Sequence, residues 1–142
     1  MCKTPSVKPR WYEERLQLRH ELLQLAQEFV KNTRAGLGPI SAWLYGSVAR
    51  GDFKPWSDVD VLVVAQKLPD RLLERIALLQ RFADPQVQFI SYTVDEFLSL
   101  VRRHHPNLMA ILDEAQLIAD DLGLMESVTA ARSPRFGEAK GV

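Results

Sequence analysis

The sequence predicts a small α/β domain in which a mixed β-sheet is covered by helices. Three short segments are rich in apolar and β-branched residues, as strands are. They alternate with longer segments whose apolar residues recur every three or four positions, as in helices. The predicted elements are a helix over 12–34, a strand over 40–45, a short helix after residue 46, a strand over 58–64, a helix from residue 69, a strand over 86–92, a helix to about residue 104 and a helix over 106–122.

The first predicted helix has two apolar faces. The first line of apolar residues comprises Leu18, Leu22, Leu25 and Phe29, and the second comprises Leu16, Leu23 and Val30. Helical geometry turns the second line from the first by roughly 120°. Either the helix is buried on two sides within its own domain, which we favour, or one side meets another subunit or protein.

Local signals place the ends of the other elements. The apolar run over 61–64 predicts a strand that is buried on both faces. Thr93 and Glu96 form the Thr-x-x-Glu signature of a capping box, which opens a helix. Pro106 opens the last predicted helix and Gly123 ends it. The chain therefore contains local start and stop signals that separate its predicted helices and strands.

The two ends of the chain differ in composition from the middle. Residues 1–11 combine prolines with basic residues, and residues 126–142 carry few large apolar side chains. Such segments bury too little surface to offset the entropy lost on ordering. We therefore expect a flexible lead over 1–11, one domain over 12–125 and a mobile tail over 126–142.

Charge and cysteine content narrow the function classes. Eighteen basic residues offset eighteen acidic ones, so the chain has no global field that would attract nucleic acid as its main partner. The lone cysteine, Cys2, cannot form an internal disulfide, which is typical of a reducing cytoplasm. No apolar run approaches the length of a membrane span. The composition predicts a cytoplasmic protein.

The turn after the second element has the chemistry of a phosphate site. Gly46 ends a strand and permits a tight turn, so that backbone N–H groups can approach an anion closely. Ser47 adds a hydroxyl, and the N-terminus of the short helix adds its dipole. These features predict one half of a site for a nucleoside triphosphate.

A pair of acidic residues supplies the other half. Asp58 and Asp60 are two residues apart on a predicted strand, so their side chains project from the same face. Two like charges this close repel each other unless a cation lies between them. Mg²⁺ prefers a few carboxylates together with phosphate oxygens and water. The pair is therefore predicted to hold Mg²⁺ and to serve in metal-assisted nucleotidyl transfer.

The combined motif resembles a known signature. Gly46-Ser47, ten intervening residues and Asp58-x-Asp60 resemble the signature of the DNA polymerase β-like nucleotidyltransferase superfamily. Gly-Ser-x-x-Arg-Gly-Asp followed by Ser-Asp-x-Asp more closely resembles the minimal nucleotidyltransferase (MNT) group, and the resemblance covers approximately residues 40–121. It implies a polymerase β-like fold, in which Gly46 and Ser47 hold the phosphates of ATP or another triphosphate. Asp58 and Asp60 would be catalytic and would coordinate Mg²⁺.

Other positions carry roles that the resemblance or the residue type leaves open. Arg50 falls on the motif arginine, where it would neutralise phosphate charge, or it pairs structurally with Asp52 or Asp58. Trp56 either stacks on a base or packs beneath its own loop. The family places a third carboxylate where this sequence has Gln88. An amide cannot act as a general base, so this position is degenerate.

The resemblance also implies an acceptor. Members of the MNT group are commonly paired with a helical HEPN protein, in a toxin–antitoxin arrangement in which the transferase modifies its partner. The implied activity is transfer of AMP from ATP to a hydroxyl of a HEPN-type partner, with a homo-oligomer also compatible. The alternative is a catalytically weakened nucleotide-binding module that acts by binding its partner, because Gln88 replaces the third carboxylate.

Overall fold

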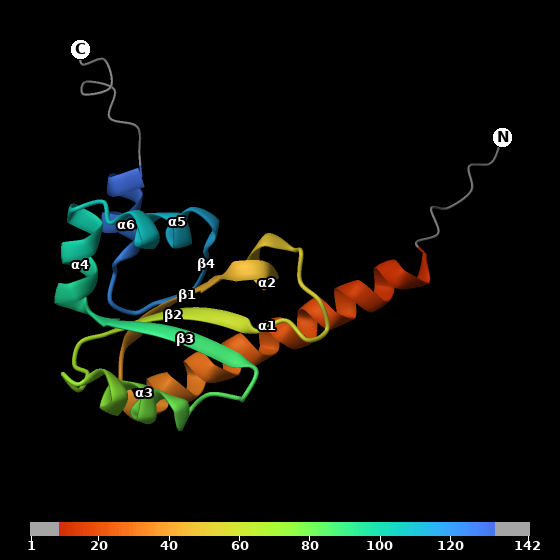
Figure 1. Ribbon diagram of the computed structural model, residues 1–142, viewed down its shortest axis with the longest axis horizontal. Coiled ribbons are helices and arrows are strands. Elements are labelled where there is room, and N and C mark those ends of the chain that lie inside the picture. The colour runs from red at the N-terminus through yellow and green to blue at the C-terminus, as the bar shows by residue number, and fades with distance from the viewer. Residues whose placement is uncertain (1–8, 133–142) are drawn as a thin grey trace, which may run out of the picture.

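A computed structural model describes residues 9–132 and confirms the α/β fold (Figure 1). The described elements are α1 (Arg10–Leu37), β1 (Ile40–Tyr45), α2 (Gly46–Arg50), β2 (Val59–Ala65), α3 (Leu72–Gln80), β3 (Val87–Thr93), α4 (Val94–Arg102), α5 (Pro106–Glu114), β4 (Gln116–Asp120) and α6 (Met125–Arg132). Within this part of the chain, no helix combines the length and apolar character needed to cross a membrane. The predicted capping box at Thr93 and Glu96 is confirmed at the start of α4.

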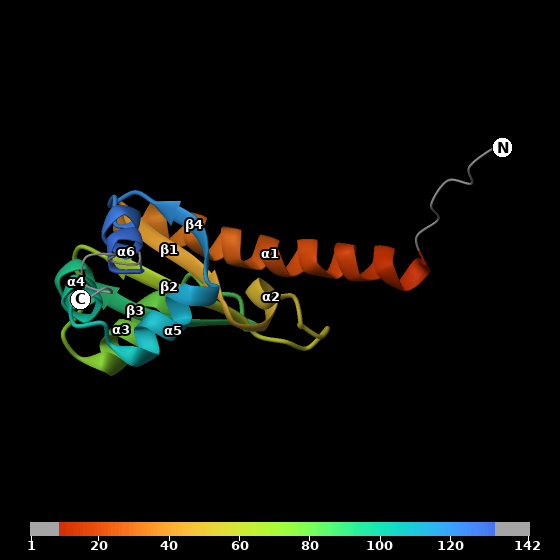
Figure 2. The ribbon, with the colours of Figure 1, turned by 90° about the horizontal axis from the view of Figure 1, so that it is seen from above.

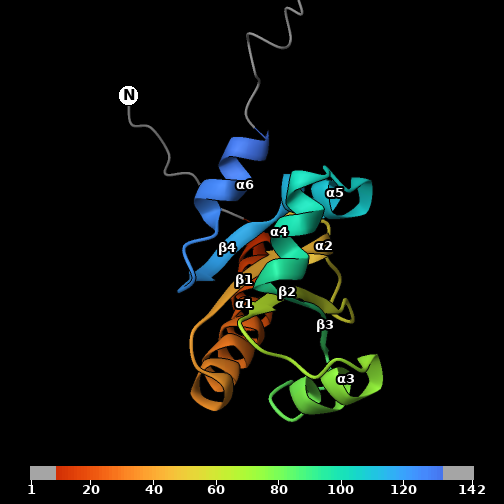
Figure 3. The ribbon, with the colours of Figure 1, turned by 90° about the vertical axis from the view of Figure 1, so that its left-hand side faces the viewer.

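The strands form one mixed sheet in the order β3-β2-β1-β4. β1 runs antiparallel to both of its neighbours, whereas β2 and β3 are parallel. The parallel pair is connected through α3, which lies beside the sheet (Figure 3). Because β1 and β2 are the two central strands, the turn that leaves β1 and the residues that enter β2 are held by neighbours on both sides.

Helices cover both faces of this sheet (Figures 1 and 2). On one face, α1 packs through Leu22 and Phe29 against the valines of β2 that share its side. On the other face, the Trp43 and Phe97 rings stack with centroids 5.3 Å apart, beneath α4, α5 and α6. Residues 61–65 of β2 are buried, which confirms the predicted burial on both faces.

The second apolar face of α1 is only partly covered. Val30 is buried and Leu23 packs at the edge of the core, whereas Leu16 is 50% exposed. Figure 2 shows why: the N-terminal part of α1 extends past the end of the sheet. Burial within the chain, which we favoured, therefore holds for the C-terminal part of α1 and not for Leu16.

The predicted helix over 106–122 is wrong in its second half. The α5 helix ends at Glu114, Ala115 is extended, and β4 pairs with the free side of β1. Spacing alone could not show this, because the apolar residues of this segment also fit one helix face. Pairing with an unfilled sheet edge outweighed the helical pattern. Asp120 fixes the new strand by accepting a hydrogen bond from the Ser41 hydroxyl at 2.8 Å.

The predicted boundaries at both ends also need correction. The mobile-tail expectation is wrong for residues 126–132, because α6 is helical from Met125 and buries Val128 against the core. The Trp43 indole N–H also donates to the Met125 sulfur at 3.3 Å. At the other end, α1 begins at Arg10, inside the expected lead. Residues 1–8 and 133–142 lie outside the described part.

Candidate active site

The sequence-predicted glycine, serine, arginine and aspartates come together at one cavity. The cavity measures about 500 Å³ and lies where α2 and α5 meet the ends of β1 and β2. Its lining residues are Tyr45, Gly46, Ser47, Arg50, Asp58, Asp60, Ala110, Ile111 and Glu114. The three residues from α5 and Tyr45 were not expected from the sequence.

Gly46 lies against Asp60, so the predicted phosphate turn and the acidic pair are close together. Its φ of 77° lies in the left-handed region that side chains disfavour. A Cβ at this position would also collide with the carboxylate of Asp60. The close approach follows from sheet register, since Tyr45 of β1 is paired directly with Asp60 of β2. Glycine is therefore required here for two independent reasons, backbone conformation and space.

The surroundings of Asp60 disfavour its charged form. Asp60 lies in β2 and is partly buried, whereas Asp58 precedes the strand and is exposed. Burial raises the pKa of Asp60 above its ordinary value, and the negative charges of Asp58 and Glu114 raise it further, while Arg50 acts in the opposite direction. A bound cation would offset the repulsion between these negative charges. Two carboxylates with room for phosphate and water form a donor set that fits Mg²⁺.

The candidate cation site rests on the two predicted aspartates, without a third acid at the position of Gln88. Among the described residues, no group of three or more His, Cys, Asp or Glu side chains is arranged to hold a metal ion. Gln88 is the direct register partner of Asp60 on the parallel strand β3. Gln88 also lines a neighbouring cavity of about 370 Å³ beside α3. An amide therefore lies next to Asp60 in the sheet.

Glu114, at the C-terminal end of α5, is the charged residue among the lining residues that the sequence did not predict. Its Oε2 accepts a hydrogen bond from the Gly46 N–H at 2.7 Å. Its carboxylate also pairs with Arg50, whose Nη1 lies 3.2 Å from Oε1 and 3.1 Å from Oε2. No local pattern could reveal this contact, because 64 positions separate Arg50 from Glu114.

Arg50 is held by acidic residues on two sides. Besides Glu114, Asp52 accepts a hydrogen bond from Nε of Arg50 at 3.4 Å. The hydrogen bond with Glu114, and then the one with Asp52, raise the pKa of Arg50 above its ordinary value. Arg50 thus forms ion pairs with Asp52, one of the two structural partners expected from the sequence, and with Glu114. The guanidinium nevertheless lines the same cavity as Ser47.

The loop between α2 and β2 is anchored by Phe53 rather than Trp56. Phe53 is buried, and the Arg15 guanidinium lies 4.1 Å from its ring centroid. Arg15 also donates a hydrogen bond to the Gly51 carbonyl at 2.7 Å. Trp56 is 75% exposed, so it does not pack beneath its loop, and stacking on a base stays a prediction.

Comparison with known proteins decides the family. Residues 22–118 match the family described as "Nucleotidyltransferase domain", and this range contains every residue of the candidate site. The chain belongs to the nucleotidyltransferase domain family. Members of this family are transferases of phosphorus-containing groups, so the resemblance stated from the motif is confirmed at this level.

Two individual proteins are similar to this nucleotidyltransferase domain. A protein of Methanocaldococcus jannaschii named "Putative protein adenylyltransferase MJ1305" is 39% identical over 61 residues, which is 42% of this chain and 42% of that protein. The match thus spans less than half of the relative. A solved structure, "a putative nucleotidyltransferase from Sulfolobus solfataricus", superposes with a TM-score of 0.56 and 20% identity, over 81% of this chain and 90% of the other. That likeness supports the fold.

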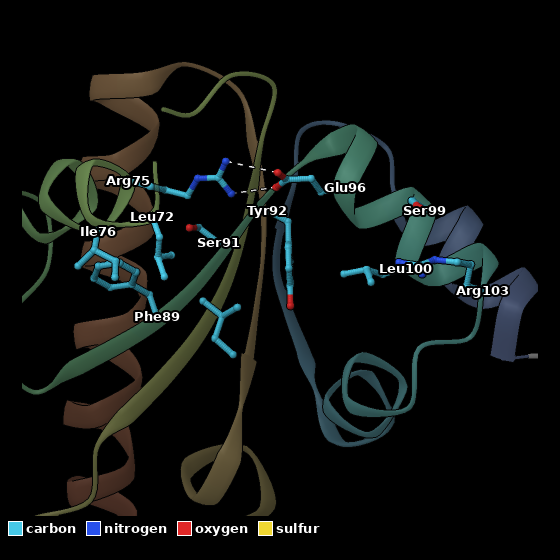
Figure 4. Close-up of a pocket in the computed structure, with 11 residues that line it drawn as sticks. Leu72, Arg75, Ile76, Phe89, Ser91, Tyr92, Glu96, Ser99, Leu100 and Arg103 are labelled. Carbon is cyan, nitrogen blue, oxygen red and sulfur yellow. Dashed lines mark hydrogen bonds and ion pairs between the residues drawn. The ribbon is translucent and has the colours of Figure 1, made fainter. Parts of the chain in front are cut away.

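A second groove of this nucleotidyltransferase domain has different chemistry. It measures about 590 Å³ and lies between α3 and α4 along β3, away from the motif (Figure 4). Its one carboxylate, Glu96, is paired with Arg75 at 2.9 Å, and Arg75 also donates to the Pro69 carbonyl. These contacts tie α3 to α4. The lining of this groove includes no acidic pair, so the cavity at Gly46 is the candidate site that matches the sequence motif.

Proposed function

We propose that this domain transfers a nucleoside monophosphate, AMP from ATP, to a hydroxyl group of a protein partner in the presence of Mg²⁺. The observation that carries the proposal is the meeting of Gly46 and Ser47 with Asp58 and Asp60 at one cavity. A phosphate turn and a carboxylate pair that share a cavity are what positioning of a metal–triphosphate requires.

In the proposed reaction, the turn holds the phosphate tail and the aspartates hold the cation. The backbone N–H of Gly46 and the hydroxyl of Ser47 would bind phosphate oxygens, with Arg50 offsetting their charge. Mg²⁺, when bound by Asp58 and Asp60, supplies charge neutralisation at the α-phosphate. The acceptor oxygen forms a bond to the α-phosphorus, the bond to the bridging oxygen breaks, pyrophosphate leaves, and the hydroxyl proton passes to water.

The proposal of a protein acceptor is supported by one relative and by the MNT-like motif. The M. jannaschii protein is named as a protein adenylyltransferase, and its match covers 42% of its length. We extend the proposal to an antitoxin role, in which a HEPN-type partner encoded beside this chain carries the modified hydroxyl. The partner also provides the test, because modification changes its mass.

The experiment combines the domain, Mg²⁺, ATP and the protein encoded by the neighbouring gene, followed by intact mass spectrometry. The expected result is a shift of the neighbour by one or more AMP units. Asp58→Asn/Asp60→Asn serves as the matched control, since it preserves side-chain size while removing the cation ligands. An unmodified neighbour under conditions where the domain binds ATP would count against the protein acceptor.

A second candidate function is nucleotide binding without turnover. It is favoured by Gln88, which stands beside Asp60 where a third acid would complete a two-metal site. Gln88→Glu is the probe, and Gln80→Glu is its control, because Gln80 lines the same side cavity from α3. Activity that appears with Gln88→Glu alone identifies a degenerate transferase. Turnover of ATP by the parent chain contradicts the binding-only function.

A further inference from the structure

The proposed phosphate ligands of this domain are already engaged by an internal anion. The Gly46 N–H donates to Glu114 Oε2 at 2.7 Å, and the Arg50 guanidinium pairs with the same carboxylate at 3.1 Å. These are two of the groups that the proposed function assigns to the triphosphate. One side chain therefore contacts both the turn and the motif arginine.

The Glu114 carboxylate presents the features that a phosphate group would present. It carries a negative charge and two acceptor oxygens, and a backbone N–H and a guanidinium are donors that bind carboxylate and phosphate alike. Gly46 has a single N–H to donate. A phosphate oxygen and Glu114 cannot both take that proton with good geometry. One of them must leave.

The position of Glu114 makes its release feasible. It is the last residue of α5, and its side chain is 28% exposed, so a change of side-chain rotamer can carry the carboxylate into solvent. Staying in place would be unfavourable once a triphosphate enters. Mg²⁺ would neutralise Asp58 and Asp60, whereas among the described residues Glu114 forms its ion pair with Arg50, which the phosphates also need.

We propose that Glu114 is an internal competitor of the triphosphate, which holds Gly46 and Arg50 in the free domain and is displaced when a nucleotide binds. The proposal rests on the proposed function, because it takes the Gly46 turn as the phosphate site. It gives Glu114 a specificity role: polyphosphates with high negative charge displace it, and weakly charged nucleotides do not.

The test measures binding of Mg·ATP, and of tripolyphosphate alone, to the parent and to Glu114→Gln. The amide keeps the size of Glu114 but loses the charge that competes for Arg50. If the released state is about one tenth of the free population, removing the competitor lowers the apparent Kd about tenfold for both ligands. Glu126→Gln, an equal change of charge on an exposed residue of α6, should leave the Kd unchanged.

The measured Kd values distinguish a competitor role for Glu114 from a role in bracing Arg50. An unchanged or higher Kd for Glu114→Gln, with the parent binding normally, overturns the competitor role and assigns Glu114 to bracing Arg50. A parent chain that binds neither ligand refutes the proposed function itself, and the competitor with it. Thermal melting checks the fold of each variant. Should Glu114→Gln not fold, Glu114→Ala gives the same comparison, with the same expected tighter binding.

Discussion

Replacement of Gly46 by alanine should disable the site while costing the fold little. The left-handed φ of 77° penalises a side chain by about 1–2 kcal/mol, which corresponds to a fall in Tm of roughly 3–8 °C for a chain of this size. The added Cβ also collides with the Asp60 carboxylate and must displace it. Because Asp60 is a proposed cation ligand, binding of Mg·ATP should be lost or weakened at least tenfold.

The matched control is Gly51→Ala, at the other end of α2. Gly51 has a φ of 96°, and a Cβ added there meets no atom within 4 Å. This variant should show a similar loss of Tm from backbone strain and should retain Mg·ATP binding. Differential scanning fluorimetry and isothermal titration calorimetry on both variants separate the two effects. If Gly46→Ala binds Mg·ATP as the parent does, the close approach of the turn to Asp60 is irrelevant to function.

Two further predictions concern stability. Hydrogen bonding from Arg75 lowers the pKa of Glu96, so this carboxylate stabilises the fold above its unfolded pKa, and that stability is lost as the pH falls through its folded pKa. Glu96→Gln should therefore lower the free energy of unfolding by about 1 kcal/mol at pH 7, because the side chain is 46% exposed and its ion pair is partly screened by solvent. In acid the same substitution should cost little. An equal loss at both pH values, measured by urea titration, would contradict the ion pair. Val128→Ala should cost about 1.5–2.5 kcal/mol if α6 completes the core, and a change below 0.5 kcal/mol, of the order seen for surface sites, would show that residues 126–132 add nothing to it.

The sequence predicts which residues meet at the candidate site where those residues are close along the chain. Gly46 and Ser47 open α2, directly after β1, whereas Asp58 and Asp60 lie at the start of β2, so the pairing of two consecutive strands is enough to bring them together. The antiparallel register of β1 on β2 then brings Tyr45 opposite Asp60. Gln88 lies in β3, within the strand predicted over 86–92, and is the register partner of Asp60; its assignment to the third-carboxylate position stays a prediction.

The strand β4 and the position of Glu114 could not be predicted, because both depend on contacts between distant segments of the chain. Residues 116–120 carry apolar spacing that suits a helix or a strand, and only the free side of β1 makes them β4. Glu114 lies close to Gly46 because β4, which follows α5 directly, pairs with β1 from Gln116 onwards. The contact therefore depends on a strand that the sequence did not predict. An error in one element therefore concealed a residue of the site.

The most direct measurement is a calorimetric titration of ATP into the parent chain and into Asp58→Asn/Asp60→Asn, with and without Mg²⁺. Our account predicts saturable binding by the parent that depends on Mg²⁺, and loss of that dependence in the double variant. Equal binding by both proteins, or no binding by the parent at millimolar ATP with Mg²⁺, would contradict the assignment of this cavity to a metal–triphosphate.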